Sequence, residues 1–388
     1  MKAVAKYWWV IASVLLFLPG SADGGQPPTR VDVEHQMGLR SEGDLVRGQM
    51  DTVGFVVTAE QAGDVLDTAL EAENDALKAD RRRLGLNKGE GVPAVICPHD
   101  DHLYAAGVYV HATELIRAPR VILIGVFHKA RYWDLEDRLV FDRFEAWHGP
   151  WGPVPVDPLR EELIAAMAPE EIVINNTMHC REHSLEAILP FLQHTDPKVQ
   201  IIPILVPYMN WETMATLADN LSGALAASLE RHGWRLGRDV AIVISTDLIH
   251  YGPDFEHAPF GTDSAAYDQA AGRDQRLIRE HLEGPLQPKK LQGLLSRLVD
   301  EDHVRSYRIP WCGRFSVPFG LELLRRTAER LDLGVPEGTL LRYGSSLSEP
   351  ELPVSAASRE AGLGLTAPSN FHHWVGYGAV AYGINDRP

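Results

Sequence analysis

Residues 121–128 read Val121-Ile122-Leu123-Ile124-Gly125-Val126-Phe127-His128, and this stretch indicates the fold most directly. Its apolar residues continue without polar alternation, which is typical of a strand that is buried on both faces. Strands of this kind occur in parallel sheets covered by helices on both sides. A histidine stands where the strand ends, and in such sheets ligands bind beyond the carboxyl ends of the strands.

Similar apolar runs alternate with helical segments along most of the chain. The strand-like runs cover residues 93–97, 121–126, 139–141, 172–174, 201–206, 240–244, 340–343 and 374–382. The segments with helical periodicity cover residues 58–83, 103–117, 157–168, 184–194, 212–230, 264–282 and 317–332. Together they predict an α/β fold with a mostly parallel central sheet flanked by helices.

The first residues have the composition of a targeting segment. Lys2 and Lys6 precede an uncharged apolar run at residues 7–18, and breakers and small residues follow at 19–22. This order predicts a secretory signal peptide at residues 1–22. The apolar run is shorter than the roughly 20 residues that a membrane-spanning helix needs, although a retained anchor is the alternative.

The predicted signal implies export to the periplasm or the extracellular space, with no stable membrane insertion after its removal. Residues 23–88 form a predicted N-terminal arm and helix, and residues 89–388 form the α/β domain. The net charge is −16, from 37 Lys and Arg against 53 Asp and Glu. This balance disfavours nucleic acid as a partner, because phosphates attract basic residues.

The cysteines of the sequence are Cys97, Cys180 and Cys312. An odd count leaves at least one thiol, and Cys97 with Cys180 could form a disulfide in an oxidising compartment. Three cysteines are too few to form a disulfide framework in a chain of 388 residues. The hydrophobic core must therefore hold the fold.

Three of the predicted strands end in residues that can bind metals. His99 and His128 each follow one strand, and Asp247 and His250 follow a third. A single histidine at a strand end is commonly a structural residue, but three strands that deliver such residues to one edge form a different pattern. Neutral imidazole is the commonest metal ligand and suits Zn, Cu and Fe. The pattern therefore predicts a site for a single transition-metal ion.

A fourth group lies in His179-Cys180-Arg181-Glu182-His183-Ser184-Leu185-Glu186, and two interpretations of it are open. If a helix begins early, Glu182 and Glu186 share one of its faces. If Ser184 instead caps a helix that starts at Leu185, Glu182 and His183 lie on the loop that faces the site. A cluster that only caps the helix and forms salt bridges is the structural alternative.

These motifs, together with one near the end of the chain, form a series that resembles a known family. The series is Pro98-His99, His128, Glu182-His183-Ser184-Leu185-Glu186, Ser245-Thr246-Asp247-Leu248-Ile249-His250-Tyr251-Gly252 and Cys312-Gly313-Arg314. In this order it resembles the Memo-like family, also called AmmeMemoRadiSam system protein B, over roughly residues 90–385. The family is similar in fold to class III extradiol ring-cleaving dioxygenases, whose nonhaem iron lies in a corresponding cleft.

The resemblance implies that His99, His128 and Cys312 are metal ligands. Two imidazoles and a thiolate suit Fe or Cu, with Zn as a third choice, and they leave coordination positions open. We therefore expect one transition-metal ion as the cofactor.

The candidate catalytic residues are His250, Asp247 and His183. The resemblance places His250 at the position of an acid or base in the dioxygenase relatives. The predicted function is that of an exported metal-binding protein, a nonhaem iron or copper oxidoreductase of the dioxygenase type that acts on a small molecule. The alternative is a non-catalytic module that binds a metal or ligand in the same cleft, so the sequence leaves open whether the protein is an enzyme.

The sequence departs from the family pattern after two of its histidines. The family has Ala-Gly-Tyr after the first, whereas this chain has Asp100-Asp101-His102 after His99. These residues either add ligands and charge to the site or change its shape, and His102 either supports the site or is exposed. Lys129 follows His128, where the family has a second histidine. A thiolate ligand in an exported protein must also escape oxidation.

Overall fold

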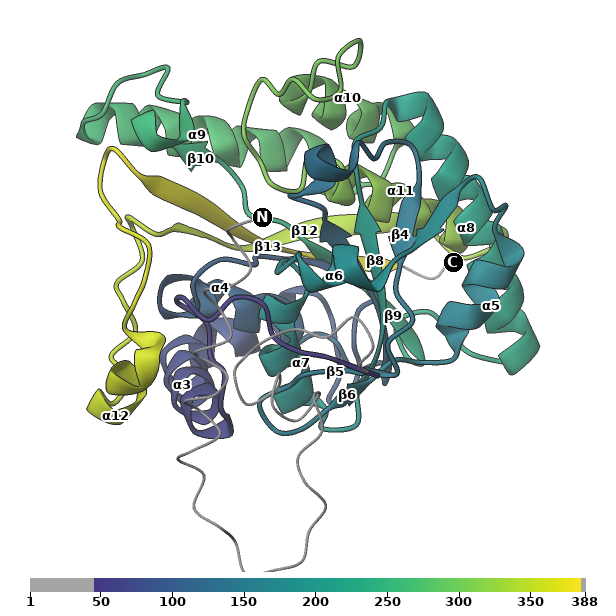
Figure 1. Cartoon of the computed structure of the whole chain (residues 1–388), viewed down its shortest axis with the longest axis horizontal. Helices are drawn as coiled ribbons and strands as arrows, with labels where there is room; N and C mark the ends of the chain where they lie inside the picture. Colours follow the sequence, from purple (N-terminus) through teal and green to yellow (C-terminus); the bar gives the residue numbers. More distant parts are fainter. Residues whose placement is uncertain (1–44, 385–388) are drawn as a thin grey trace, which may run out of the picture. The chain divides into compact units, whose positions relative to one another are not determined.

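The computed structural model describes residues 45–384 (Figure 1). The predicted signal peptide at residues 1–22 lies outside this range. All the described residues belong to one compact unit. The helix predicted within 58–83 is α3 (Ala59–Arg83), and it lies in the same unit as the sheet, packed against α4 (His102–Thr113).

Four parallel strands form the centre of the main sheet. They are β2 (Ala94–Cys97), β9 (Val240–Ser245), β3 (Arg120–Val126) and β8 (Gln200–Val206), in this spatial order. Almost all their residues are buried, because helices cover both faces of this part of the sheet. The apolar runs of the sequence thus correspond to strands that have no solvent-exposed face.

Antiparallel strands flank this parallel centre, so the sheet as a whole is mixed. The order is β11-β12-β13-β2-β9-β3-β8-β4-β7, and β13 is antiparallel to both β12 and β2. These outer strands are β4 (Leu139–Phe141), β7 (Ile172–Ile174), β10 (His250–Tyr251), β11 (Gly284–Pro285), β12 (Pro336–Ser345) and β13 (Trp374–Ile384). The predicted α/β class is confirmed. Parallel pairing dominates where a helix crosses between strands, whereas β12 and β13 follow each other without a long helix and pair as antiparallel neighbours.

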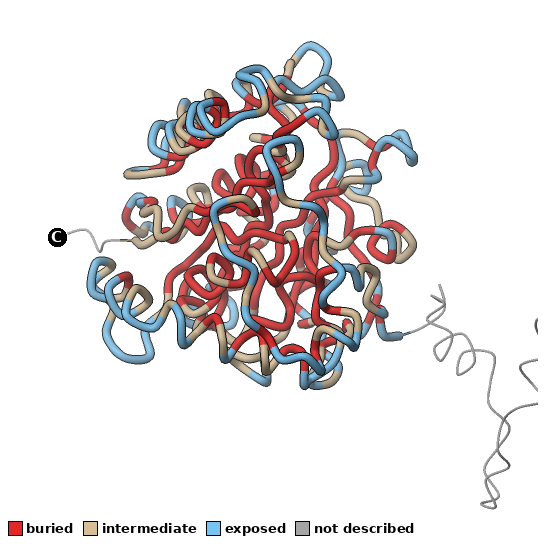
Figure 2. The backbone as a smooth tube through the Cα atoms, turned by 90° about the vertical axis from the view of Figure 1, so that its left-hand side faces the viewer, coloured by how far each residue is buried: buried red, intermediate tan, exposed pale blue. Residues whose placement is uncertain are grey.

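Helices cover both faces of the sheet (Figure 1). On one face α4 contacts β2, β12 and β13, and α3 packs outside it; on the other, α11 (Ser316–Arg330) contacts β3 and β9 and carries α8 (Trp211–His232). Within residues 45–384 the remaining α-helices are α5 (Leu159–Ala166), α6 (Asn176–Cys180), α7 (Leu189–Thr195), α9 (Ser264–His281), α10 (Pro288–Leu298) and α12 (Ala356–Ser358). Figure 2 shows the buried residues gathered between these layers.

The sequence analysis missed α10. Its buried residues Leu291, Leu294, Leu295 and Leu298 follow the helical spacing i, i+3, i+4 and i+7 and were a usable signal. A small second sheet also forms, in the order β1-β5-β6, from β1 (Val46–Arg47), β5 (Ala146–Trp147) and β6 (Val154–Pro155). Within residues 45–384, no helix combines the length and apolar character needed to cross a membrane.

A buried carboxyl group links α9 to the strands beside the predicted site. Asp274 is fully buried and accepts hydrogen bonds from Trp311 Nε1 at 2.6 Å and from the Tyr343 hydroxyl at 3.1 Å. A Cβ atom at position 376 would lie 2.7 Å from Asp274 Oδ2, so a side chain there would displace this carboxyl group. Burial raises the pKa of Asp274 to about 7, despite these hydrogen bonds, which lower it.

We predict that Asp274→Asn changes the pH dependence of stability. The pKa of Asp274 in the folded protein, about 7, exceeds its ordinary value of 3.8, so the folded state binds the proton more tightly. The stability that this proton contributes is complete below about pH 4 and is lost as the pH rises through about 7. The unfolding free energy of the wild type should therefore fall relative to the variant by about 1 kcal/mol per pH unit in that window.

Urea unfolding at a series of pH values measures this difference. The same substitution at Asp268, which is exposed on the same helix, is the control. A difference between the wild type and Asp274→Asn that stays constant from pH 4 to pH 7 would contradict the prediction.

Candidate metal centre

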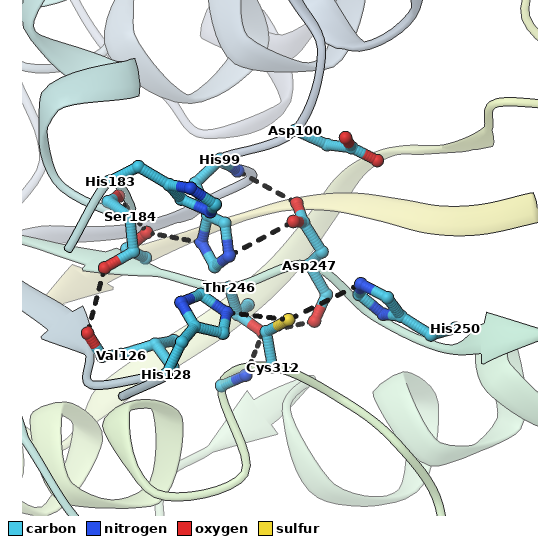
Figure 3. Close-up of polar contacts among 12 residues, drawn as sticks. His99, Asp100, Val126, His128, His183, Ser184, Thr246, Asp247, His250 and Cys312 are labelled. Carbon is cyan, nitrogen blue, oxygen red and sulfur yellow. Dashed lines mark hydrogen bonds and ion pairs between the residues drawn. The ribbon is translucent and has the colours of Figure 1, made fainter. Parts of the chain in front are cut away.

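The carboxyl ends of three neighbouring strands meet at one edge of the sheet. β2, β9 and β3 lie side by side, and the chain leaves them toward His99, Asp247 and His128 respectively. The ligand atoms of His99, His128 and Cys312 lie within 4.8 Å of one another, and Figure 3 shows these side chains converging. This group could hold a metal ion.

Two further groups share members with this one. Asp247 and His250 lie with Cys312, and Glu182 and His183 lie with His128, each group within 4.8 Å. The structure thus brings together the predicted ligands, the candidate catalytic residues His183, Asp247 and His250, and Glu182, which one interpretation of the sequence had placed on the loop at the site.

The hydrogen bonds of His99 determine which of its nitrogens is available to a metal. The Ser245 hydroxyl donates its only proton to the carbonyl of Ser184 at 2.6 Å, so at 2.8 Å it must accept from His99 Nδ1. The proton therefore sits on Nδ1, and Nε2 carries the lone pair. Burial, together with the nearby rings of His128 and His183, lowers the pKa of His99 well below its usual value, so the ring is neutral.

A carboxylate orients His128 in a similar way. Glu182 accepts hydrogen bonds from His128 Nδ1 at 2.9 Å and from the backbone N–H groups of His128, His183 and Ser184. Burial alone would raise the pKa of Glu182, but these partners lower it below its usual range. Because the ionised carboxylate holds the Nδ1 proton, His128 turns Nε2 toward Cys312 Sγ, 3.2 Å away.

Backbone hydrogen bonds bring Cys312 to the end of β9. Its N–H donates to the carbonyl of Asp247 at 3.2 Å, and the N–H of Gly313 donates to Thr246 Oγ1 at 2.9 Å. A side chain at position 313 would collide with Thr246. The short Cys-Gly sequence therefore allows the loop to come close enough to place the sulfur in the site.

Asp247 and His250 form the second group around the sulfur. Asp247 Oδ1 accepts the N–H of His99 at 2.9 Å, and burial, with the charge of Asp100, raises the pKa of Asp247 well above its usual value. His250 donates from Nδ1 to the carbonyl of Leu248 at 3.1 Å, which leaves Nε2 facing Cys312 Sγ at 3.5 Å. Burial alone would lower the pKa of His250, but Cys312 raises it.

His183 is held by a residue that the sequence analysis did not single out. Its Nδ1 lies 3.2 Å from Asp51 Oδ2, and its ring lies between those of Phe55, His99 and His128. Burial alone would lower the pKa of His183, but the hydrogen bond to Asp51 raises it. The segment that precedes α3 therefore forms one wall of the site.

This N-terminal segment is attached by a buried ion pair. The side chains of Arg47 and Glu186 are 1% and 5% exposed, and Arg47 also donates to the carbonyls of His179 and Glu182. The Glu186 carboxylate accepts the N–H groups of two residues of the segment, at positions 50 and 51. Removing either partner of such a pair strongly destabilises the folded protein, because the other partner is left as an uncompensated buried charge.

The two interpretations of the 179–186 stretch can now be separated. A 3₁₀ turn begins only at Glu186, so Glu182 and Glu186 do not share a helix face, whereas Glu182 and His183 do lie on the loop at the site. Ser184 caps no helix. Its hydroxyl instead donates to the carbonyl of Val126 at the end of β3, at 3.0 Å.

The departures after His99 have structural explanations. Among the described residues, neither Asp100 nor Asp101 belongs to a group that could hold a metal, and Figure 3 shows Asp100 apart from the cluster. Asp101 accepts the N–H of Ala367 at 2.8 Å, and burial, with Asp100, raises its pKa to about 7. His102 is buried, not exposed; it accepts the N–H of Val56 and donates to the carbonyl of Ala187.

The disulfide considered between Cys97 and Cys180 is absent from the described structure. Cys97 is fully buried in β2, and burial raises the pKa of its thiol well above the usual value. Cys180 ends α6, and it is also buried.

The residues present fit a transition-metal ion. His99 Nε2 is buried and lies 3.2 Å from Asp247 Oδ2, yet it makes no hydrogen bond of acceptable geometry in the described structure. A buried nitrogen with an unused lone pair is costly unless something binds it. The soft sulfur of Cys312 and the Nε2 atom of His128 lie within coordination reach of the same point.

Sequence comparison with known proteins identifies the family. The family model for Memo-like proteins matches residues 58–358. The chain belongs to the Memo-like family. This Memo-like protein is 26% identical over 257 residues to a MEMO1 family protein of Methanothermobacter thermautotrophicus, an alignment that covers 66% of the chain and 78% of the relative. It is 30% identical over 258 residues to a MEMO1 family protein of Aquifex aeolicus, covering 65% and 78% respectively.

We predict that Ser245→Ala weakens metal binding by this Memo-like protein about ten- to a hundredfold. The substitution removes the acceptor that keeps the proton on His99 Nδ1. A fraction of the molecules then carries the proton on Nε2, where it blocks metal binding. Competition with a chelator of known affinity measures the dissociation constant.

Ser316→Ala is the matched control, since Ser316 is equally buried and donates to the Ser245 carbonyl without touching a histidine. Equal affinities in the wild type and Ser245→Ala would show that the serine does not support the ligand.

Proposed function

We propose that the protein binds one iron or copper ion, with zinc as a third candidate, through His99, His128 and Cys312, and uses it to oxidise or reduce a small molecule. The buried, unbonded Nε2 of His99 is the observation that carries this proposal. It supports a bound ion in preference to a hydrogen-bonded cluster of side chains, because the ring is neutral and its other nitrogen is already engaged.

A bound ion of this kind would supply Lewis acidity and, for iron or copper, electron transfer. The protein contributes the surroundings. His250 is the proton carrier in this proposal, because its Nδ1 is held by a carbonyl while Nε2 faces the sulfur. A histidine held in one tautomer in this way can take up or release a proton near neutral pH.

Asp247 and His183 complete the enclosure. Asp247 orients the backbone of His99, and burial raises the pKa of its carboxyl group well above the usual range. His183, held by Asp51, lies over the rings of both imidazole ligands. We propose that these two side chains position a bound substrate and keep bulk water away from it.

Metal loading followed by a turnover assay tests the function. The full chain, loaded with ferrous or cupric ion without oxygen, should retain one equivalent by elemental analysis, and both His99→Ala and Cys312→Ala should lose it. His303→Ala, at a histidine whose side chain is 77% exposed, is the control. With copper, the absorption band from the Cys312 sulfur should disappear in Cys312→Ala.

His250→Gln should retain the metal but consume oxygen with catechol substrates about 10²- to 10⁴-fold more slowly. One equivalent of iron or copper without any turnover would reject the oxidoreductase and favour a metal-binding module. Unchanged metal content in His99→Ala would reject the site itself.

We also propose that the protein is exported, on the basis of the basic, apolar and small segments of residues 1–22. Mass spectrometry of the full chain after fractionation of an expressing bacterium should find a mature N-terminus near residue 23 in the periplasmic fraction. Leu15→Arg, which interrupts the apolar run, should leave the uncleaved chain in the cytoplasm. An uncleaved wild-type chain in the cytoplasm would contradict export.

A further inference from the structure

A pocket of about 320 Å³ opens beside the sulfur of Cys312. His250 and Cys312, both labelled in Figure 3, line it. Phe255 and Tyr307 line its sides, and Phe255 packs its ring against that of His250 with centroids 5.0 Å apart. The pocket is therefore partly aromatic, and it leads directly to the candidate metal centre.

One cation lines this pocket without a carboxylate partner. Arg314 donates from Nη1 to the carbonyl of Trp311 at 2.7 Å, and its guanidinium lies over the ring of Tyr307 at 4.9 Å. Its Nε is buried and has no hydrogen-bond partner among the described residues. No described carboxylate forms an ion pair with Arg314, although Asp254 and Glu256 line the same pocket.

Other arginines of the same loop do have a carboxylate nearby, so the lack of one is particular to Arg314. Arg305 pairs with Asp134 and Glu136, and the nearest oxygen of Asp300 lies 3.8 Å from Arg308. Arg314 is held by a carbonyl and an aromatic ring, which fix its position without neutralising its charge.

The guanidinium of Arg314 has no described carboxylate partner, and an oxyanion is the partner that an unpaired guanidinium binds best. Carboxylates and phosphates match the planar arrangement of N–H donors, whereas neutral hydroxyl groups do not. Glu256 and Asp254 repel further negative charge, so the pocket suits a ligand with a single anionic group.

We propose that Arg314 forms an oxyanion-binding subsite of this pocket, for a small molecule that carries one carboxylate or phosphate group. The body of the molecule lies between Phe255 and Tyr307 and points toward Cys312 and His250. The inference rests on the proposed function only in calling this ligand the substrate, because binding itself requires no turnover.

Calorimetric titration of the metal-loaded full chain tests the subsite with three probes of similar size. Benzoate and phenyl phosphate carry the oxyanion, and benzyl alcohol is the neutral counterpart. At least one anion should bind, and the stronger of the two identifies the preferred group. Arg314→Gln should weaken that binding about ten- to a hundredfold, which corresponds to the loss of charge-assisted hydrogen bonds.

Two further variants control for unfolding and for general charge. Arg314→Lys keeps the charge and should lose less affinity than Arg314→Gln, while Arg308→Gln removes an exposed cation of the same loop and should bind like the wild type. All three variants should retain the metal content of the wild type.

Wild-type affinity for the stronger anion in Arg314→Gln would overturn the proposal, as would benzyl alcohol binding as tightly as that anion. Anion binding that disappears in His99→Ala but persists in Arg314→Gln would place the anion on the metal and would also overturn it. Failure of the oxygen assay, by contrast, leaves these binding results unchanged, so the two proposals fail separately.

Discussion

The carboxylate of Glu182 accepts four hydrogen bonds, and the geometry of the site depends on them. Three come from backbone N–H groups and one from the ring of His128. A buried carboxylate must be satisfied in this way, because burying it unpaired would cost several kcal/mol. The requirement locks the loop of residues 182–184 onto the end of β3, where Ser184 meets Val126. Without this lock His128 would have no defined direction, and the carbonyl that orients Ser245, and through it His99, would be lost.

Much of the fold follows from the sequence because its central strands are buried on both faces. Such strands need apolar residues at every position, so runs such as 121–126 stand out without an alignment. The convergence of His99, Asp247 and His128 follows from the same fact, since parallel strands end at one edge. Cys312 lies in an irregular loop with no periodicity, and only the family resemblance indicated it before its contacts were known.

Other parts of the site could not be predicted, because they depend on contacts between distant residues. The region around Asp51 has the composition of a linker, yet the Arg47–Glu186 pair spans 139 positions and holds it against the sheet. Local sequence does not encode such a partner. Asp101 is the opposite case, in which the sequence suggested a role that the structure does not show. Its place two residues after His99 suggested a metal ligand, but its carboxylate accepts a hydrogen bond from the backbone of Ala367.

The position of β13 also determines how much of the chain must be made before the central sheet can be completed. This strand, residues Trp374–Ile384, lies between β12 and β2, so the chain's last strand borders its first core strand. A ribosome that has released only the first 300 residues has delivered neither Cys312 nor the neighbour that completes one side of β2. Pairing between such distant segments is slow to form. The complete ligand set and the second neighbour of β2 are therefore both supplied by segments that the ribosome makes late.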